Sequence, residues 1–254
     1  LSAIQPYHTD RKWVNDHLLD TFARYVKNGV TSVVDMGGPN WNFTVKQAAN
    51  HQVMAPRITT AGPLISPMAM PQLDIEGTIF QRVSSPQQAI ESVKQQLKYQ
   101  PDIIKIVWTP EAGHSPAQLT ELFSGAIKLA HQHKLPVAVH VESLVNAKMA
   151  IKAGADVLVH GVLLEAVDDE FVELIKKNRV IYMPTLAAHK NYIDIFAGDQ
   201  HFSAHEVTHA HPDIIKSFKK LNKNTDQADM IFKMIRKYMQ YVNASAEDIT
   251  TLSE

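Results

Sequence analysis

Short apolar runs alternate with amphipathic segments along most of this chain. Between about 13 and 183, apolar residues recur at a spacing of three or four positions in some segments, which is typical of helices with one buried face. The segments between them are short and rich in valine and isoleucine, which favours buried strands. Strands that alternate with helices of roughly 10–15 residues predict a parallel sheet with right-handed crossovers.

Six strands and six intervening helices follow from this pattern. A long loop is predicted over 63–85, and its Met68 and Met70 belong either to a lid over a substrate pocket or to a plain surface loop. Beyond Leu186 the alternation stops, and 203–243 is predicted to be helical within a single domain, 1–254. The strands are predicted at 30–36, 57–62, 102–108, 137–141, 156–160 and 180–183, and the helices at 13–28, 42–50, 86–99, 116–133, 144–153 and 168–178.

Two of the predicted strands end on a histidine. Pro136-Val-Ala-Val-His140 and Ala155-Asp-Val-Leu-Val-His160 are separated by one predicted helix. Because the carboxyl ends of successive parallel strands lie on one face of the sheet, the two imidazoles are expected side by side. Paired imidazoles at that face predict a metal site.

Composition narrows the function without identifying it. The 254 residues are 45% apolar and 20% charged, and the net charge of −1 gives no electrostatic reason to expect nucleic acid or an anionic membrane as a partner. The absence of cysteine excludes disulfides and thiolate metal sites. No apolar run approaches the ~18 residues of a membrane span. The chain opens on Leu1, which is compatible with removal of an upstream segment. The compartment stays open between the cytoplasm and, if that segment was a signal peptide, the periplasm.

Six segments in this order resemble the metal-dependent amidohydrolase superfamily, in its imidazolonepropionase-like and Xaa-Pro dipeptidase branch. The resemblance covers roughly 20–190. The segments are Gly29-Val-Thr-Ser-Val-Val-Asp-Met-Gly-Gly38, Pro56-Arg-Ile-Thr-Thr-Ala-Gly62, Asp102-Ile-Ile-Lys-Ile-Val107, Val137-Ala-Val-His140, Ala153-Gly-Ala-Asp-Val-Leu-Val-His-Gly161 and Pro184-Thr-Leu186.

This resemblance implies a fold and a set of metal ligands. The implied fold is a distorted (β/α)8 barrel that holds one or two divalent metals, usually zinc, at the carboxyl ends of its strands. Lys105 matches the lysine that is carboxylated to a carbamate and bridges two metals, while His140 and His160 match the ligands on strands five and six. The superfamily also uses a His-x-His pair on strand one and an aspartate on strand eight.

Neither of those two elements is found at its expected place. His131-Gln-His133 falls at a predicted helix end, and His8 and His17 stand alone. Asn224-Thr225-Asp226 and Asp199 lack a preceding apolar strand, so they are rejected as the aspartate of strand eight. The segments therefore predict an apparently incomplete barrel with strands two to seven recognisable.

Each of these side chains has a simpler interpretation. His140 can be a hydrogen-bonded core histidine, and Lys105 a strand lysine whose amine reaches water. His201, His205 and His209 are spaced so that one helix face carries all three; with His211 they form a second cluster, for which a solvated polar face is preferred over adventitious zinc or nickel binding.

The resulting prediction is a metal-dependent hydrolase of an amide or peptide-like C–N bond acting on a small molecule or dipeptide, inactive if the missing elements are truly absent. The alternative is a non-catalytic binding or assembly domain derived from the same barrel. A lyase or isomerase on this scaffold stays open as a third prediction. An open sheet with two exposed edges also predicts a homo-oligomer.

Overall fold

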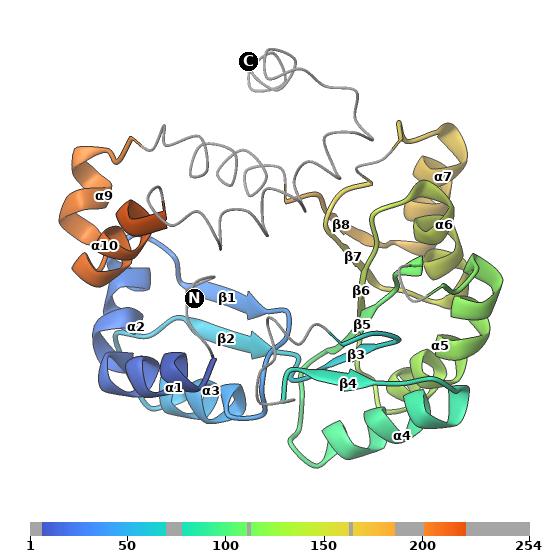
Figure 1. Ribbon diagram of the computed structural model, residues 1–254, viewed down its shortest axis with the longest axis horizontal. Helices are drawn as coiled ribbons and strands as arrows, with labels where there is room; N and C mark the ends of the chain where they lie inside the picture. Colours follow the sequence, from blue (N-terminus) through green and yellow to red (C-terminus); the bar gives the residue numbers. More distant parts are fainter. Residues whose placement is uncertain (1–6, 70–77, 111–112, 163–164, 186–200, 222–254) are drawn as a thin grey trace.

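The computed structural model describes residues 7–69, 78–110, 113–162, 165–185 and 201–221. Its strands all run parallel, and helices cover one side of them (Figure 1). Eight strands are described: β1 (Ser32–Asp35), β2 (Arg57–Thr60), β3 (Leu64–Ser66), β4 (Phe80–Arg82), β5 (Ile104–Val107), β6 (Val137–His140), β7 (Val157–Val159) and β8 (Ile181–Met183).

The strands form a two-stranded ladder, β1-β2, and a six-stranded sheet in the order β4-β3-β5-β6-β7-β8. β2 and β3 are successive parts of one chain segment broken at Gly62, whose φ of +83° suits glycine. The register pairs Lys105 with Ala138, Val107 with His140, and His140 with Val159. The ladder therefore runs from β3 through β5, β6 and β7 to β8 in chain order, while β4 lies at the edge of the sheet beside β3.

The helices follow the strands as the sequence pattern predicts. Ser85 caps the helix that starts at Pro86, and Ser115 forms a capping box with Gln118. The helices are α1 (Tyr7–Asp16), α2 (Leu18–Lys27), α3 (Asn42–Asn50), α4 (Pro86–Leu97), α5 (Pro116–Gln132), α6 (Leu144–Ala153), α7 (Asp169–Asn178), α9 (Ala204–His209) and α10 (Pro212–Leu221).

Alternate residues of each strand belong to two different clusters. Ile104, Ile106 and Trp108 join the large core between the sheet and helices α4–α7. The opposite face carries a small cluster of strand residues, which includes Ile103 and Ala138. Lys105 shares this second face by strand alternation, so it points away from the helices.

Two details differ from the sequence prediction. The loop predicted over 63–85 contains two short strands, β3 and β4, that pair with each other. Each is only three residues long, and the polar residues within them hide a strand pattern. The single helix predicted over 13–28 is two helices that break at His17, where φ is −119° and ψ is 14°.

Some predictions fall on residues outside the described ranges. These are Met70, the Asp199 and Asn224-Thr225-Asp226 segments, and the part of the predicted 203–243 helical region beyond Leu221. Within the described part of the chain, no helix combines the length and apolar character needed to cross a membrane.

Candidate metal centre at the strand ends

His140 and His160 meet at the carboxyl ends of β6 and β7. Their ring centroids lie 4.6 Å apart with an interplanar angle of 68°. Each residue is only partly exposed. The structure thus brings together the two imidazoles that the sequence places twenty positions apart.

A left-handed backbone conformation brings His160 to this position. Val157 and Val159 face the small cluster, so regular alternation would turn His160 towards the helices. Its φ of +75° breaks the alternation, and its ring instead contacts His140. A non-glycine residue in this conformation costs of order 1 kcal/mol or more, and such strain is concentrated at functional sites.

Lys105 lies on β5, next to the strand that carries His140. It is 2% exposed, and its Nζ has no hydrogen-bond partner among the described residues. Burial without an anion lowers the pKa of the amine to about 7. A substantial fraction of the amine is therefore neutral at neutral pH, and the neutral amine is the form that reacts with carbon dioxide to give a carbamate.

These residues fit a divalent metal. A buried amine without a partner is costly unless it is neutralised or modified, and carboxylation would turn it into an oxygen ligand. Two imidazoles in contact supply the nitrogen donors that zinc prefers. Lys105, His140 and His160 are therefore chemically able to serve as ligands of a divalent metal.

Three polar residues near the strand ends were missed by the sequence analysis. Glu142 places Oε1 at 3.4 Å from Nε2 of His140, and Oγ1 of Thr185 lies 3.2 Å from Nδ1 of His160. His114, in the loop after β5, has a buried Nδ1 without a partner among the described residues. Glu142 follows the strand-end histidine by two positions, a spacing that is readable in the sequence, whereas the other two depend on tertiary placement.

The histidines between 201 and 211 do not form the single cluster that the sequence predicts. His205 and His209 stack at 4.1 Å on α9, but His201 precedes that helix, so the three do not share one helix face. His211 is separate from both and packs against His17, with ring centroids 4.9 Å apart. His17 is therefore not isolated in space.

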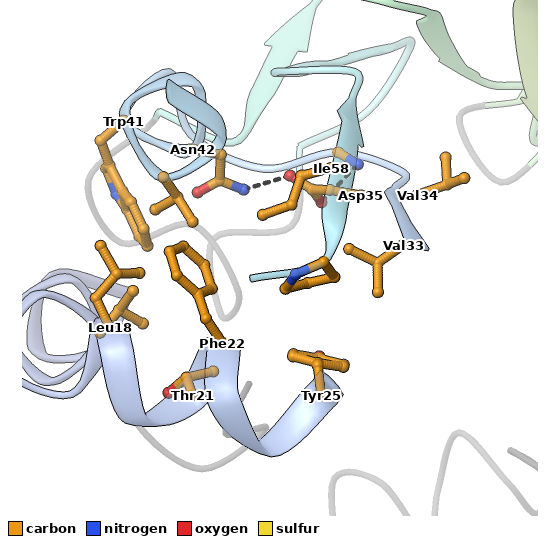
Figure 2. Close-up of a pocket in the computed structure, with 14 residues that line it drawn as sticks. Leu18, Thr21, Phe22, Tyr25, Val33, Val34, Asp35, Trp41, Asn42 and Ile58 are labelled. Atoms are coloured by element: carbon orange, nitrogen blue, oxygen red, sulfur yellow. Dashed lines mark hydrogen bonds between the residues drawn. The ribbon is translucent and has the colours of Figure 1, made fainter. Parts of the chain in front are cut away.

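A pocket of about 290 Å³ lies on another side of the molecule, between α2, β1 and α3. Figure 2 shows Leu18 and Phe22 on one wall and Trp41 on the other. Its one carboxylate, Asp35, accepts hydrogen bonds from the Gly37 N–H and the side chains of Asn42 and Thr60. Because both oxygens are engaged, Asp35 holds β1 to its neighbours, and the pocket is apolar without a free base.

Comparison of the whole sequence with models of protein families identifies the family of this chain. The model of the amidohydrolase family matches residues 15–239, and the chain belongs to that family. Members of this family generally bind divalent metals. No curated protein gives a significant match.

Solved structures agree on the fold. An Xaa-Pro dipeptidase with methionine bound in its active site is 23% identical, with a TM-score of 0.56, and the match covers 88% of this chain and 55% of that protein. A putative prolidase from Bifidobacterium longum is 20% identical, with a TM-score of 0.55, over 91% and 61% of the two chains. Ochratoxinase from A. niger is 17% identical, with a TM-score of 0.58, over 87% and 53%.

The family match confirms the predicted superfamily, and these neighbours confirm its (β/α)8 barrel, of which the described strands form an incomplete set. The chain spans little more than half the length of each of the three. A dipeptidase and a prolidase among them agree with the predicted branch, while identities of this order establish the fold alone.

Proposed function

We propose that this protein is a metal-dependent hydrolase of an amide or peptide-like C–N bond, with a dipeptide as the favoured substrate class. The observation that carries the proposal is the pairing of His140 and His160 at the strand ends, where their ring centroids are 4.6 Å apart. The buried Lys105 lies on the adjacent strand. Family membership and the dipeptidase and prolidase neighbours support it.

The chain's own residues would act as follows. His140 and His160 hold the metal through imidazole nitrogens, and Lys105 contributes as a carbamate. Zinc is the favoured metal, because nitrogen and carboxylate-type oxygen ligands suit it. When bound, such an ion supplies a Lewis acid for a carbonyl oxygen and lowers the pKa of water.

Glu142 is the positioning residue for His140. Because Oε1 of Glu142 lies 3.4 Å from Nε2 of His140, the Nδ1 of the ring would be the nitrogen left to bind the metal. Carboxylates that accept from a ligand histidine fix its ring and raise its basicity. Thr185 restrains His160 in the same manner from the neighbouring strand end.

A specific observation favours the second function, a non-catalytic assembly domain. Within the described residues, β1 pairs only with β2 and β8 pairs only with β7. Both strands carry an exposed aliphatic side chain, Val34 at 49% and Ile181 at 60%. Unpaired strand edges of this kind pair with another chain, so a homo-oligomer is part of this second proposal.

Metal content and hydrolysis test the two functions together. Protein purified without a histidine tag or chelator is measured for zinc per chain and assayed on a panel of dipeptides with proline in the second position. We expect activity to fall at least tenfold and the metal content to fall by about one equivalent or more in His140→Ala and His160→Ala, and both to persist in the matched control His205→Ala. A metal content and an activity that are both unchanged in the two strand-end variants contradict the proposed site, and metal without hydrolysis of any amide favours the assembly domain.

A further inference from the structure

A second group of potential metal ligands lies far from the strand ends. His17, His211 and Asp213 each offer one ligand atom, and these atoms all lie within 4.8 Å of one another. His17 is the residue between α1 and α2, while His211 and Asp213 are at the start of α10. Figure 1 shows α9 and α10 beside α2, on the opposite side of the molecule from β6–β8.

The donor set suits zinc or a similar borderline divalent cation. Two imidazoles and one carboxylate are common ligands of such ions, and water completes the coordination in an open site. The Nδ1 of His211 and Oδ2 of Asp213 are 3.8 Å apart. Two ligands that are each about 2.1 Å from one ion are separated by at most about 4.2 Å, so this pair already fits a common ion.

Hydrogen bonding leaves one nitrogen of His17 open. Its Nδ1 lies 2.9 Å from the carbonyl oxygen of Trp13. Because a carbonyl only accepts, this nitrogen carries the proton in the neutral ring, and Nε2 keeps its lone pair. A backbone carbonyl that holds the far nitrogen of a ligand histidine is the usual arrangement around zinc.

Trp13 orders all three side chains. Its ring stacks on His17 at 4.5 Å and meets His211 edge-on at 5.0 Å, and its Nε1–H points to Oδ2 of Asp213 at 3.5 Å. The side chain of His211 is only 15% exposed, whereas Asp213 is 61% exposed. The imidazoles are thus held in place, and the carboxylate is free to rotate by the small amount that closure on an ion requires.

We propose that His17, His211 and Asp213 form a second divalent-metal site, which links the first two helices to α10. The ligands come from positions nearly two hundred residues apart, so an ion bound to all three stabilises the packing of α1 and α2 against α10. The role is structural, because the cluster lies away from the strand ends. Binding requires the Nδ1 of His211 to give up its long, 3.2 Å hydrogen bond from the Asp213 N–H.

The neighbouring histidines provide a demanding control. His209-Ala-His211 is a His-x-His sequence, yet its two rings take part in different contacts. His209 stacks on His205, and Nε2 of His205 lies 2.7 Å from Oδ1 of Asn28. Two stacked imidazoles on one helix face, here the exposed His205 and the partly exposed His209, are also the arrangement that binds zinc adventitiously, so substitution of this pair separates the proposed site from a surface site.

The test uses the full chain with His140→Ala and His160→Ala, which removes the strand-end site, so the result does not depend on the proposed function. Chelator-treated protein is titrated with Zn²⁺ by calorimetry and with Co²⁺ by visible absorption. We expect about one equivalent of metal and a rise in Tm of a few degrees with Zn²⁺. His17→Ala or His211→Ala should weaken binding at least tenfold and remove the rise in Tm, while His205→Ala with His209→Ala should change neither.

Folding defects are separated from loss of ligation by a conservative variant. Asp213→Asn keeps an acceptor for the Trp13 indole but is a poorer ligand, and the far-ultraviolet circular dichroism of each metal-free variant reports its fold. Unchanged affinity in both the His211→Ala and Asp213→Asn proteins overturns the proposal. So does loss of binding in the His205→Ala, His209→Ala protein alone, which identifies an adventitious surface site.

Discussion

The two histidine groups lie in regions that are built differently. The main layer, β3–β8 with α4–α7, encloses the large apolar core, and His140 and His160 are at the ends of its strands. The flanking layer consists of α1–α3, β1, β2, α9 and α10 and contributes no residue to that core. It packs around its own side chains, such as Phe22 and Phe43, and contains the His17 cluster.

The two layers differ in which interactions hold the histidine side chains in position. In the main layer, strand register and a large buried core hold the strands that carry the imidazoles. In the flanking layer, packing between residues from distant parts of the sequence fixes the imidazoles. The strand-end site is therefore expected to be rigid before metal binds, and the helix cluster to gain order from metal. Each prediction below compares matched changes in the two layers.

The largest difference is expected from core truncation. Phe123 on α5 is fully buried beside Trp108, whereas Phe22 on α2 borders the pocket of about 290 Å³. Phe123→Ala should lower the free energy of unfolding by about 4 kcal/mol, and Phe22→Ala by about 2–3 kcal/mol, because a side chain beside a pocket loses fewer contacts. Urea unfolding of the two variants measures both values. Equal losses would mean that the two layers are packed equally well.

Lys105→Met tests the charge buried in the main layer. In metal-free, carbon-dioxide-free protein, burial lowers the pKa of Lys105 from 10.5 to about 7. Between pH 7 and pH 10.5 the lysine is protonated in the unfolded chain but mostly neutral in the folded one, so the unfolded chain binds more protons. The free energy of unfolding therefore rises with pH across this range. Below pH 7 the folded state carries the full cost of a buried cation. From pH 7 to 9 this rise is about 2 kcal/mol.

The Lys105→Met protein should lack this rise, and it should be the more stable of the two at pH 6. Urea unfolding at pH 6, 7, 8 and 9 provides the comparison, with His17→Ala as a control that keeps the lysine. A pH profile that is identical with and without Lys105 would show that the amine is not buried as a free base.

Asp102 and Asp156 each precede a strand and accept a hydrogen bond from the backbone of a neighbouring strand, and substituting them tests how the two layers are connected. Asp102 precedes β5 and accepts from the Thr60 N–H of β2 at 2.9 Å and from Lys46 of α3. Asp156 precedes β7 and accepts from the Val137 N–H of β6 at 2.7 Å, with His131 of α5 at 2.9 Å. Removal of either carboxylate leaves a backbone donor unpaired, which costs about 1–3 kcal/mol.

The consequences of these two changes should differ in extent. Asp102→Ala should speed amide hydrogen exchange in β1, β2 and α3 while β6 and β7 stay protected, because the flanking layer opens separately. Asp156→Ala should lower the free energy of unfolding without such selective exchange, because β6 and β7 are part of the large core. Uniform exchange changes in both variants would show that the two layers unfold as one unit.

The sequence predicts much of the main layer, because its strands and helices are encoded by patterns within short stretches of sequence. Strands β5–β8, helices α4–α7 and the closeness of His140 to His160 all follow from short apolar runs of regular spacing and from the parallel topology. Strands β3 and β4 of the same layer are missed, because each is three residues long and contains polar residues. The left-handed backbone at His160 could not be predicted, since no glycine marks it. The contact between His17 and His211 depends on helix packing across the whole chain, and no local pattern encodes it.

The smallest expected effect comes from removing a helix N-cap. The comparison is direct, because the same capping-box motif occurs in each layer. Ser115 caps α5 and Ser203 caps α9, and each forms a capping box with the third residue of its helix, Gln118 or Glu206. Loss of a cap costs about 1 kcal/mol of helix stability. Ser115→Ala should lower the free energy of global unfolding by that amount, because α5 contributes many residues to the large core.

Ser203→Ala removes the same hydrogen bonds from α9, which has six residues and none that is buried. Its cost should appear as faster amide exchange within α9, with less than about 0.5 kcal/mol lost from global unfolding, because α9 opens without the rest of the protein. Excess Zn²⁺ bound at the His17 cluster should slow exchange in α10 and leave the α9 rate unchanged. Slower exchange in both helices would mean that α9 and α10 open together, and that the flanking layer is one cooperative unit.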